Sequence, residues 1–232
     1  MNFEVILFDV GNTLLRVPYD PHQRAIAAAS HLGTIPFEPY KASLNRAREE
    51  WWEAIGDHAK EDLPETWIAH NRRALELMGF EGDVSLAARI IEESFLLDGW
   101  EVYSEVVEAL EGVRALGVRM GVVSNWPPTL EATLAAAGLR EYFDVVVASG
   151  VEGYAKPHPK IFEAALNRLE AKPASTLLVG DNIVDDIRGA TEVGISSVLI
   201  DRAGDLSGHP NRIASLRELV DAGRAMWKTW QG

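Results

Sequence analysis

Short runs of large apolar residues without alternating polarity are the feature that most constrains the fold of this chain. They cover residues 5–8, 119–123, 144–148, 176–179 and 196–200. Apolar residues at helical spacing separate the later runs, as at Val106, Leu110 and Val113. Continuous apolar runs joined by helices are typical of parallel strands that are covered by helices on both faces. The pattern predicts an α/β fold with a doubly wound parallel sheet.

A long helical segment interrupts this pattern after the first run. From about His22 to Leu97 the composition changes to Ala, Glu, Arg, Leu and Trp, with no strand-like alternation. Start and stop signals predict helices over Pro21–Leu32, Pro36–Ile55, Pro64–Met78 and Val84–Leu96. We therefore expect a core of residues 1–16 and 101–232, and an inserted all-helical subdomain of residues 17–100.

Charge and residue usage exclude several kinds of partner and site. A formal net charge of −13 argues against nucleic acid or an anionic membrane surface as a partner, because both require a basic footprint. A small anionic substrate would need local cations, a metal ion or helix N-termini. The absence of cysteine excludes disulfides and thiolate nucleophiles. Because the sequence shows no targeting segment and no apolar run of membrane length, we expect a cytoplasmic protein. Its oligomeric state stays open between monomer and homodimer.

Polar residues follow four of the predicted strands, at the point where each strand ends. In chain order they are Asp9, Ser124 with Asn125, Lys156, and Asp181 with Asp185 and Asp186. Because connections in parallel sheets are short and right-handed, these strand ends gather at one edge. Phosphoryl transfer to a carboxylate requires such a set of nucleophile, donors, fixed cation and acidic cluster. Taken singly, each position also fits a turn, a surface loop or a helix N-cap.

With these motifs in this order, the sequence resembles the haloacid dehalogenase-like hydrolase superfamily, in which magnesium-dependent phosphatases predominate. The resemblance covers nearly the whole chain. Asp9 matches the family nucleophile, Ser124 the phosphate ligand of the second motif, and Lys156 the lysine of the third. The acidic fourth motif matches Gly180-Asp181-Asn182 with Asp185-Asp186. The resemblance implies a Rossmann-like catalytic core and, from the position of the insertion, the subgroup with a small helical cap.

The resemblance also implies an activity, namely hydrolysis of a small phosphorylated metabolite. Asp9 is expected to attack phosphorus and form an aspartyl phosphate, which water then hydrolyses. Ser124 and the neighbouring amide of Asn125 are expected to bind a phosphate oxygen. Lys156 is expected to compensate the charge of the nucleophile and of the phosphoryl group.

Mg²⁺ is the cofactor that the resemblance implies. Its expected ligands are Asp9, the backbone carbonyl of Gly11 and Asp181, with Asp186 bound directly or through water. All of these are oxygen ligands, which suit a hard cation.

Position 11 departs from the family pattern. Most family phosphatases carry a second Asp two residues after the nucleophile, whereas this chain has Gly11, which has no proton to donate. Losing general acid–base catalysis costs on the order of 10²–10⁴ in rate. Three readings follow: a phosphatase with a good leaving group or another proton donor, a dehalogenase acting at carbon, or a weak or inactive relative that binds ligand. Gly180-Asp181 favours the metal-dependent phosphatase, because family dehalogenases usually have Ser-Asn there.

Two further segments carry weaker signals. In the helical insertion, side chains that could line a substrate pocket are more often core residues or a solvated helix face: Trp51, Trp52, Trp67, His70, Asn71, Arg72 and Arg73. In the tail, Ile213, Leu216, Leu219 and Val220 recur at helical spacing, which predicts one or two packing helices.

Overall fold

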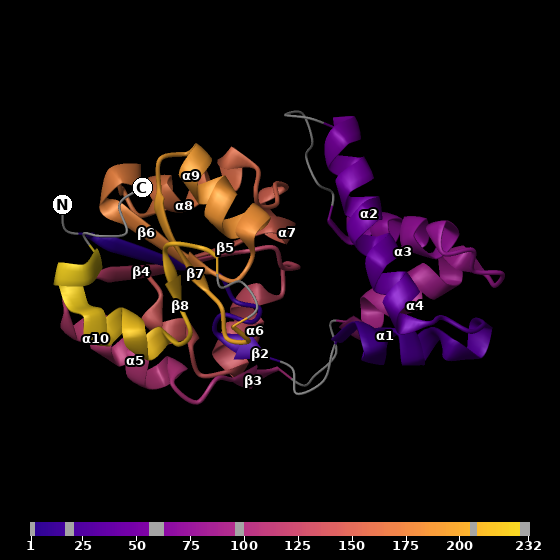
Figure 1. Cartoon of the computed structure of the whole chain (residues 1–232), viewed down its shortest axis with the longest axis horizontal. Helices are drawn as coiled ribbons and strands as arrows, with labels where there is room; N and C mark the ends of the chain where they lie inside the picture. The colour runs from indigo at the N-terminus through magenta and orange to yellow at the C-terminus, as the bar shows by residue number, and fades with distance from the viewer. Residues whose placement is uncertain (1–2, 17–20, 56–62, 96–99, 205–207, 228–232) are drawn as a thin grey trace. The chain divides into compact units, whose positions relative to one another are not determined.

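The computed structural model describes residues 3–16, 21–55, 63–95, 100–204 and 208–227. Its contacts divide the chain into two compact units, one formed by Met1–Arg16 with Glu101–Gly232 and the other by Val17–Trp100 (Figure 1). Among the described residues, no helix has both the length and the apolar composition to cross a membrane.

The first unit is built on a six-stranded sheet with the order β5-β4-β1-β6-β7-β8, in which every pairing is parallel. Its strands are β1 Val5–Phe8, β4 Arg119–Ser124, β5 Val145–Ala148, β6 Thr176–Gly180, β7 Ser196–Ile200 and β8 Arg212–Ile213. The chain places β4 and then β5 on one side of β1, and β6 and then β7 on the other. The strand order therefore reverses at β1, and ligands of doubly wound sheets bind at the carboxyl edge of such a point.

Helices cover both faces of this sheet. They include α5 Val106–Ala115, α6 Leu130–Ala136, α7 Ser149–Glu152, α8 Pro159–Arg168, α9 Gly189–Glu192 and α10 Leu216–Trp227. In Figure 1, α8 and α9 lie on one side of the sheet, and α5 and α10 pack together on the other. All four residues of β1 are buried, and Val5 and Leu7 belong to the core cluster that contains α8. Burial on both faces explains why the strand is apolar at every position, and the predicted α/β class with a doubly wound parallel sheet is confirmed.

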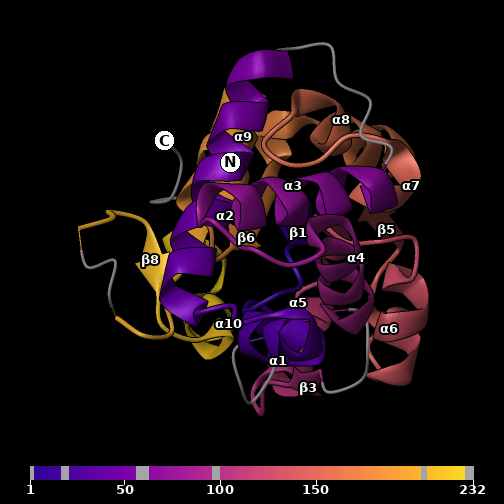
Figure 2. The same cartoon turned by 90° about the vertical axis from the view of Figure 1, so that its right-hand side faces the viewer.

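The second unit is helical in its described parts. Its elements are α1 Pro21–Ala29, the 3-10 helix η1 Ser30–Leu32, α2 Phe37–Ile55, α3 Leu63–Leu77 and α4 Val84–Phe95. Figures 1 and 2 show α2 along α3 and α1 beside α4, and these pairs are in contact. Small residues such as Ala74, Ala87 and Ala88 are fully buried between them. The four predicted helices are confirmed, with ends that agree to within three residues.

Two short strand pairings have no periodic signal in the sequence. Leu15–Arg16 (β2) and Glu101–Val102 (β3) form an antiparallel pair that is separate from the six-stranded sheet. Ile213 belongs to β8, where it pairs with Ile200, so its assignment to a helix was wrong. A two-residue strand has too few residues to show a period, so tertiary pairing decides it.

The segment after β6 is a helix with an irregular start. It begins as a π-helix, η5 Ile183–Arg188, and continues as α9. The side chain of Asn182 accepts hydrogen bonds from the backbone N–H groups of Val184 and Asp185, at 2.9 and 3.0 Å, and so forms the N-cap.

Candidate active site

Asp9 directly follows β1, in the middle of the sheet. Its backbone N–H donates to the carbonyl of Val179 at 2.9 Å, which extends the β1–β6 pairing by one residue. This hydrogen bond holds the residue in the frame of the sheet, and Asp9 is only 7% exposed. The first predicted site residue therefore lies at the carboxyl edge where the strand order reverses.

Two donors, one from a strand end and one from a loop between helices, converge on the same oxygen of Asp9. The hydroxyl of Ser124, the last residue of β4, lies 2.9 Å from Asp9 Oδ1. The ammonium of Lys156, between α7 and α8, lies 2.6 Å from it. Lys156 Nζ also contacts Asp186 Oδ1 at 2.5 Å, and the lysine side chain is 2% exposed. Lys156 thus bridges two carboxylates in a buried position.

The side chain of Asn125 fixes the loop that carries Lys156. Asn125 Oδ1 accepts from the backbone N–H of Lys156 at 2.7 Å, and Asn125 Nδ2 donates to the backbone carbonyl of Lys156 at 2.9 Å. One amide group therefore satisfies both backbone polar groups of a single residue. This pairing joins the end of β4 to the lysine loop and orients Lys156 toward Asp9.

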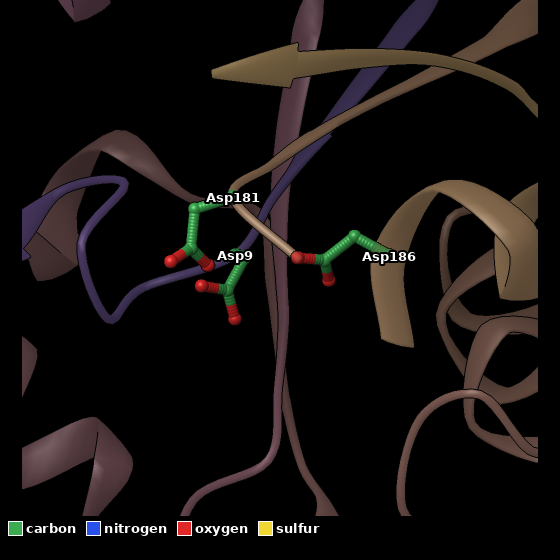
Figure 3. A group of neighbouring side chains, drawn as sticks. All are labelled: Asp9, Asp181 and Asp186. Carbon is green, nitrogen blue, oxygen red and sulfur yellow. The ribbon is translucent and has the colours of Figure 1, made fainter. Parts of the chain in front are cut away.

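Asp9, Asp181 and Asp186 form a cluster of carboxylates that can hold a metal ion (Figure 3). One oxygen from each lies within 4.8 Å of the others. Asp181 follows β6, and its Oδ2 accepts from Asn12 Nδ2 at 3.1 Å. Asp186 comes from η5, and its Oδ2 accepts from the backbone N–H of Asn182 at 3.0 Å. Asp185, which belongs to the acidic run in the sequence, is not a member of this cluster.

Burial and crowding shift the protonation of this cluster. Burial, and then the charges of Asp9 and Asp186, raise the pKa of Asp181 to about 7. Burial also raises the pKa of Asp186 to about 6, although the charge of Lys156 opposes that shift. Burial alone would lower the pKa of Lys156, but the charges of Asp186 and Asp9 outweigh it and raise that pKa. The ammonium therefore stays charged while the carboxylates compete for protons.

The donor set fits a divalent cation. When all three carboxyl groups of the cluster are ionised, the single ammonium of Lys156 leaves two negative charges uncompensated. The cluster offers only oxygen ligands. Hard cations such as Mg²⁺ and Ca²⁺ prefer oxygen ligands, whereas softer metals prefer nitrogen or sulfur. A bound divalent cation would balance the excess charge and remove the cause of the raised carboxyl pKa values.

Gly11 lies in open space beside this cluster. A Cβ atom placed on Gly11 would meet one neighbour, Cζ3 of Trp126 at 4.0 Å, which is ordinary van der Waals contact. The side chain of Trp126 is largely buried. The backbone at position 11 therefore leaves room for a side chain, and no close packing explains why this chain carries glycine there.

Sequence reasoning assigned no role to Asn12 and Arg202, which are part of this site. Asn12 contacts Asp181, and Arg202 contacts the backbone of Asn12 and Thr13. A signal for Arg202 exists, because it lies two residues beyond β7 at the same edge of the sheet. Asp9 and Asp181 were predicted as site residues because they follow a strand, and Arg202 follows β7 in the same way.

Three of the weaker candidates of the helical unit have structural partners. Arg72 and Arg73 are exposed and pair with Glu76, and Arg73 also pairs with Glu50, so they form a solvated helix face. Asn71 is buried and accepts from Tyr40 Oη at 2.7 Å. The side chains of Trp51, Trp52 and Trp67 lie outside the described residues.

A family model of haloacid dehalogenase-like hydrolases matches residues 3–194 of this chain. The chain belongs to that family. A member from Xenopus laevis, named haloacid dehalogenase-like hydrolase domain-containing protein 3, is 31% identical over 86% of this chain and 85% of its own length. A ribulose-1,5-bisphosphate 5-phosphatase from Halopiger xanaduensis is 31% identical over 92% of each chain. Membership in this family makes the protein a hydrolase.

Solved structures of the haloacid dehalogenase-like family share this fold. A HAD phosphatase from Thermococcus onnurineus is 25% identical, with a TM-score of 0.60 over 96% of this chain and 99% of its own. A 2-haloacid dehalogenase from Pseudomonas syringae is also 25% identical, with a TM-score of 0.66 over 97% of this chain and 99% of its own. Since both reaction types occur on this fold, the site residues must decide between them.

Proposed function

We propose that this hydrolase is a magnesium-dependent phosphatase that acts on a small phosphorylated metabolite through an aspartyl phosphate on Asp9. One observation carries the proposal. Asp9 lies between two groups of opposite character, with Ser124 and Lys156 on one oxygen and two further carboxylates within 4.8 Å. A nucleophile flanked by hydrogen-bond donors and a cation-binding cluster suits a substrate that brings negative charge.

In this proposal Asp9, the backbone carbonyl of Gly11, Asp181 and Asp186 would hold Mg²⁺. The cation, when bound, would supply positive charge to the phosphoryl oxygens and to the cluster. A dehalogenase acting at carbon has no use for the excess negative charge of Asp181 and Asp186 beside its nucleophile, because like charges so close together repel one another unless a cation is bound. The cluster therefore supports the phosphatase over the dehalogenase.

Asp9 attacks phosphorus with one carboxylate oxygen, the bond from phosphorus to the leaving oxygen breaks, and an aspartyl phosphate forms. Lys156 already contacts Asp9 and keeps its positive charge, so it compensates the charge that moves onto the phosphoryl oxygens. The hydroxyl of Ser124 can rotate from Asp9 to a phosphate oxygen. Water then attacks phosphorus and releases phosphate, which restores the Asp9 carboxylate.

Asn125 has two roles in this proposal. Its side chain holds both backbone polar groups of Lys156, so Asn125 binds the substrate with its backbone amide instead.

The leaving oxygen takes its proton from the substrate, from water or from the helical unit, because Gly11 has none to donate. We also assign residues 17–100 the role of the cap that selects the substrate.

The names of relatives support phosphate esters as the substrate class. Besides the ribulose bisphosphate phosphatase, a phosphoserine phosphatase from Thermus thermophilus is 30% identical over 73% of this chain and 76% of its own length. These two relatives act on different compounds. The proposal is therefore restricted to small phosphorylated metabolites as a class.

The deciding experiment measures phosphate release from p-nitrophenyl phosphate and from a panel of phosphorylated metabolites, with and without Mg²⁺. We expect Mg²⁺-dependent turnover that Asp9→Asn lowers by at least about 10³-fold, because the amide is not a nucleophile. Asp83→Asn is the matched control, since Asp83 caps α4 and asparagine caps equally well. Chloride release from a 2-haloacid without Mg²⁺, in the absence of phosphate release, would establish the dehalogenase instead.

A further inference from the structure

Arg202 lies beyond the end of β7, and its side chain reaches the loop that follows Asp9. Its Nε donates to the backbone carbonyl of Asn12 at 3.0 Å, and its Nη2 donates to that of Thr13 at 2.7 Å. Its third nitrogen, Nη1, donates to Glu105, and the guanidinium lies 3.6 Å from the ring centroid of Tyr103. All three nitrogens of the guanidinium are therefore engaged within the first unit, and Glu105 and Tyr103 fix the position of the group.

The loop that Arg202 contacts has an unusual backbone. Asn12 has a φ of 54°, in the left-handed region that L residues other than Gly, Asn and Asp rarely occupy. Its N–H donates to the carbonyl of Leu15 at 2.7 Å, and the N–H of Leu15 donates to the carbonyl of Val10 at 2.9 Å. These bonds close the turn, while the carbonyls of Asn12 and Thr13 point out to Arg202.

The same loop connects Arg202 to the carboxylate cluster. The side chain of Asn12 donates to Asp181 Oδ2 at 3.1 Å, and Asp181 is one of the three acids that can hold a metal. The contacts therefore run from Arg202 through the backbone of Asn12 to its side chain and on to Asp181. Groups that orient a metal ligand from outside tune its affinity for the metal.

We propose that Arg202 is a positioning residue for the metal site, acting through Asn12 on Asp181. This inference rests on the proposed function, because it presumes that Asp9, Asp181 and Asp186 bind Mg²⁺. Arginine suits the task, since its rigid fork of donors can hold two successive carbonyls. Lysine keeps the charge, but its compact ammonium holds a single point and does not reproduce that fork.

The experiment compares Arg202→Met, Arg202→Lys and Asn12→Ala with the wild type. Calorimetric titration with Mg²⁺ alone measures metal binding without substrate, and p-nitrophenyl phosphate measures turnover as a function of Mg²⁺. We expect Arg202→Met and Asn12→Ala to weaken Mg²⁺ binding by about tenfold each, the lower end for residues that orient a ligand. Raising the Mg²⁺ concentration should recover part of the turnover that these variants lose, and Arg202→Lys should lie between Arg202→Met and the wild type.

A double variant tests whether the two residues act along one path. Adding Arg202→Met to Asn12→Ala should weaken Mg²⁺ binding little further, because the contact through which Arg202 acts has already been removed. Additive losses would overturn the inference. If Arg202→Met does not fold, Arg202→Lys and Asn12→Ala decide the matter alone.

Arg212→Met is the matched control. Arg212 lies on the neighbouring strand β8 and pairs with the buried Asp201 at 3.0 Å, and its described contacts do not include the Asn12 loop. It should lower the melting temperature and leave Mg²⁺ affinity unchanged. A wild type that binds Mg²⁺ and releases phosphate, together with an Arg202→Met variant of equal Mg²⁺ affinity, would overturn this inference alone. A wild type that does neither would overturn the proposed function as well.

Discussion

Both units bury carboxyl groups, but they compensate them in different ways. At the carboxyl edge of the sheet, Asp9, Asp181 and Asp186 cluster together, and the ammonium of Lys156 pairs with Asp9 and Asp186. In the helical unit, Glu92 is held by a neutral amide, since Asn71 Nδ2 donates to Glu92 Oε2 at 3.1 Å. Asn71 in turn accepts from the buried hydroxyl of Tyr40.

The difference shows what each site needs to become neutral. Burial raises the pKa of Glu92 to about 7, and the hydrogen bond from Asn71 offsets only part of that shift, so a proton neutralises the group. The sheet edge carries too many carboxylates for one lysine, and a bound divalent cation would neutralise it. We infer that the sheet edge is built to bind a ligand and that the Glu92 network serves the packing of the helices.

Removing the ammonium of Lys156 tests the sheet edge most severely. We expect Lys156→Met to lower kcat/KM for phosphate release by about 10²–10³-fold, the cost of losing one electrostatic contact to the transition state. Without Mg²⁺ the variant should also be less stable at pH 8 than the wild type, because Asp9 and Asp186 lose their common partner.

Lys160→Met is the control for Lys156→Met. Lys160 is exposed and donates to the hydroxyl of Tyr154 at 2.9 Å, so its loss should leave turnover unchanged. A Lys156→Met variant as stable as the wild type at pH 8 without Mg²⁺ would contradict the contrast between the two units. Urea unfolding followed by circular dichroism measures this stability.

Gly11→Asp tests whether a missing acid limits the rate. The space beside Gly11 accepts a side chain, so we expect the variant to fold and to gain about 10² in kcat on an alkyl phosphate metabolite, whose leaving oxygen needs a proton. Gly11→Asn fills the same space without supplying a proton and should show no gain. A gain in both variants, or in neither, would mean that acid catalysis from position 11 is not the limiting factor.

Chelation of metal should reduce stability in a pH-dependent way. The raised pKa values of Asp181, about 7, and Asp186, about 6, mean that the folded state without metal binds more protons than the unfolded state between about pH 4 and 7. Stability without metal therefore falls as the pH rises through that window. Mg²⁺ at 100 times its dissociation constant should restore about 2.7 kcal/mol at pH 8 and less at pH 5. Thermal unfolding with EDTA or with Mg²⁺ measures both.

Glu92→Gln should have the smallest effect, confined to stability. Glu92 has a raised pKa in the folded state, so its burial costs stability once the pH passes its ordinary value of 4.5 and costs most above about 7. Glutamine removes that cost, and we expect a gain of about 2 kcal/mol at pH 8 that vanishes near pH 4.5. Urea unfolding at the two pH values measures it, and Glu93→Gln on the exposed side of α4 is the control. Loss of Mg²⁺ binding in Glu92→Gln would mean that the network serves the active site after all.

Much of the fold and most of the site could be predicted from local signals. The apolar run before Asp9 and the run before Asp181 mark buried strands, and parallel strands bring their carboxyl ends together. That reasoning placed Ser124 and Lys156 beside Asp9, where the structure has them. It failed for Ile213, because a two-residue strand has no period to read and the helix that follows it does.

The sequence by itself determined the order of strands and helices, the position of the helical insertion and the carboxylates at the sheet edge, because these depend on periodicity over a few residues. Only the tertiary structure decided that the side chain of Asn125 turns to the backbone of Lys156, and that Arg202 reaches the carbonyls of Asn12 and Thr13. The contact of Asn125 with Lys156 spans 31 positions of the sequence. The contacts of Arg202 with Asn12 and Thr13 span 190 and 189 positions. They exist because the packed sheet brings its strand ends together, and no local pattern encodes which side chain meets which backbone group.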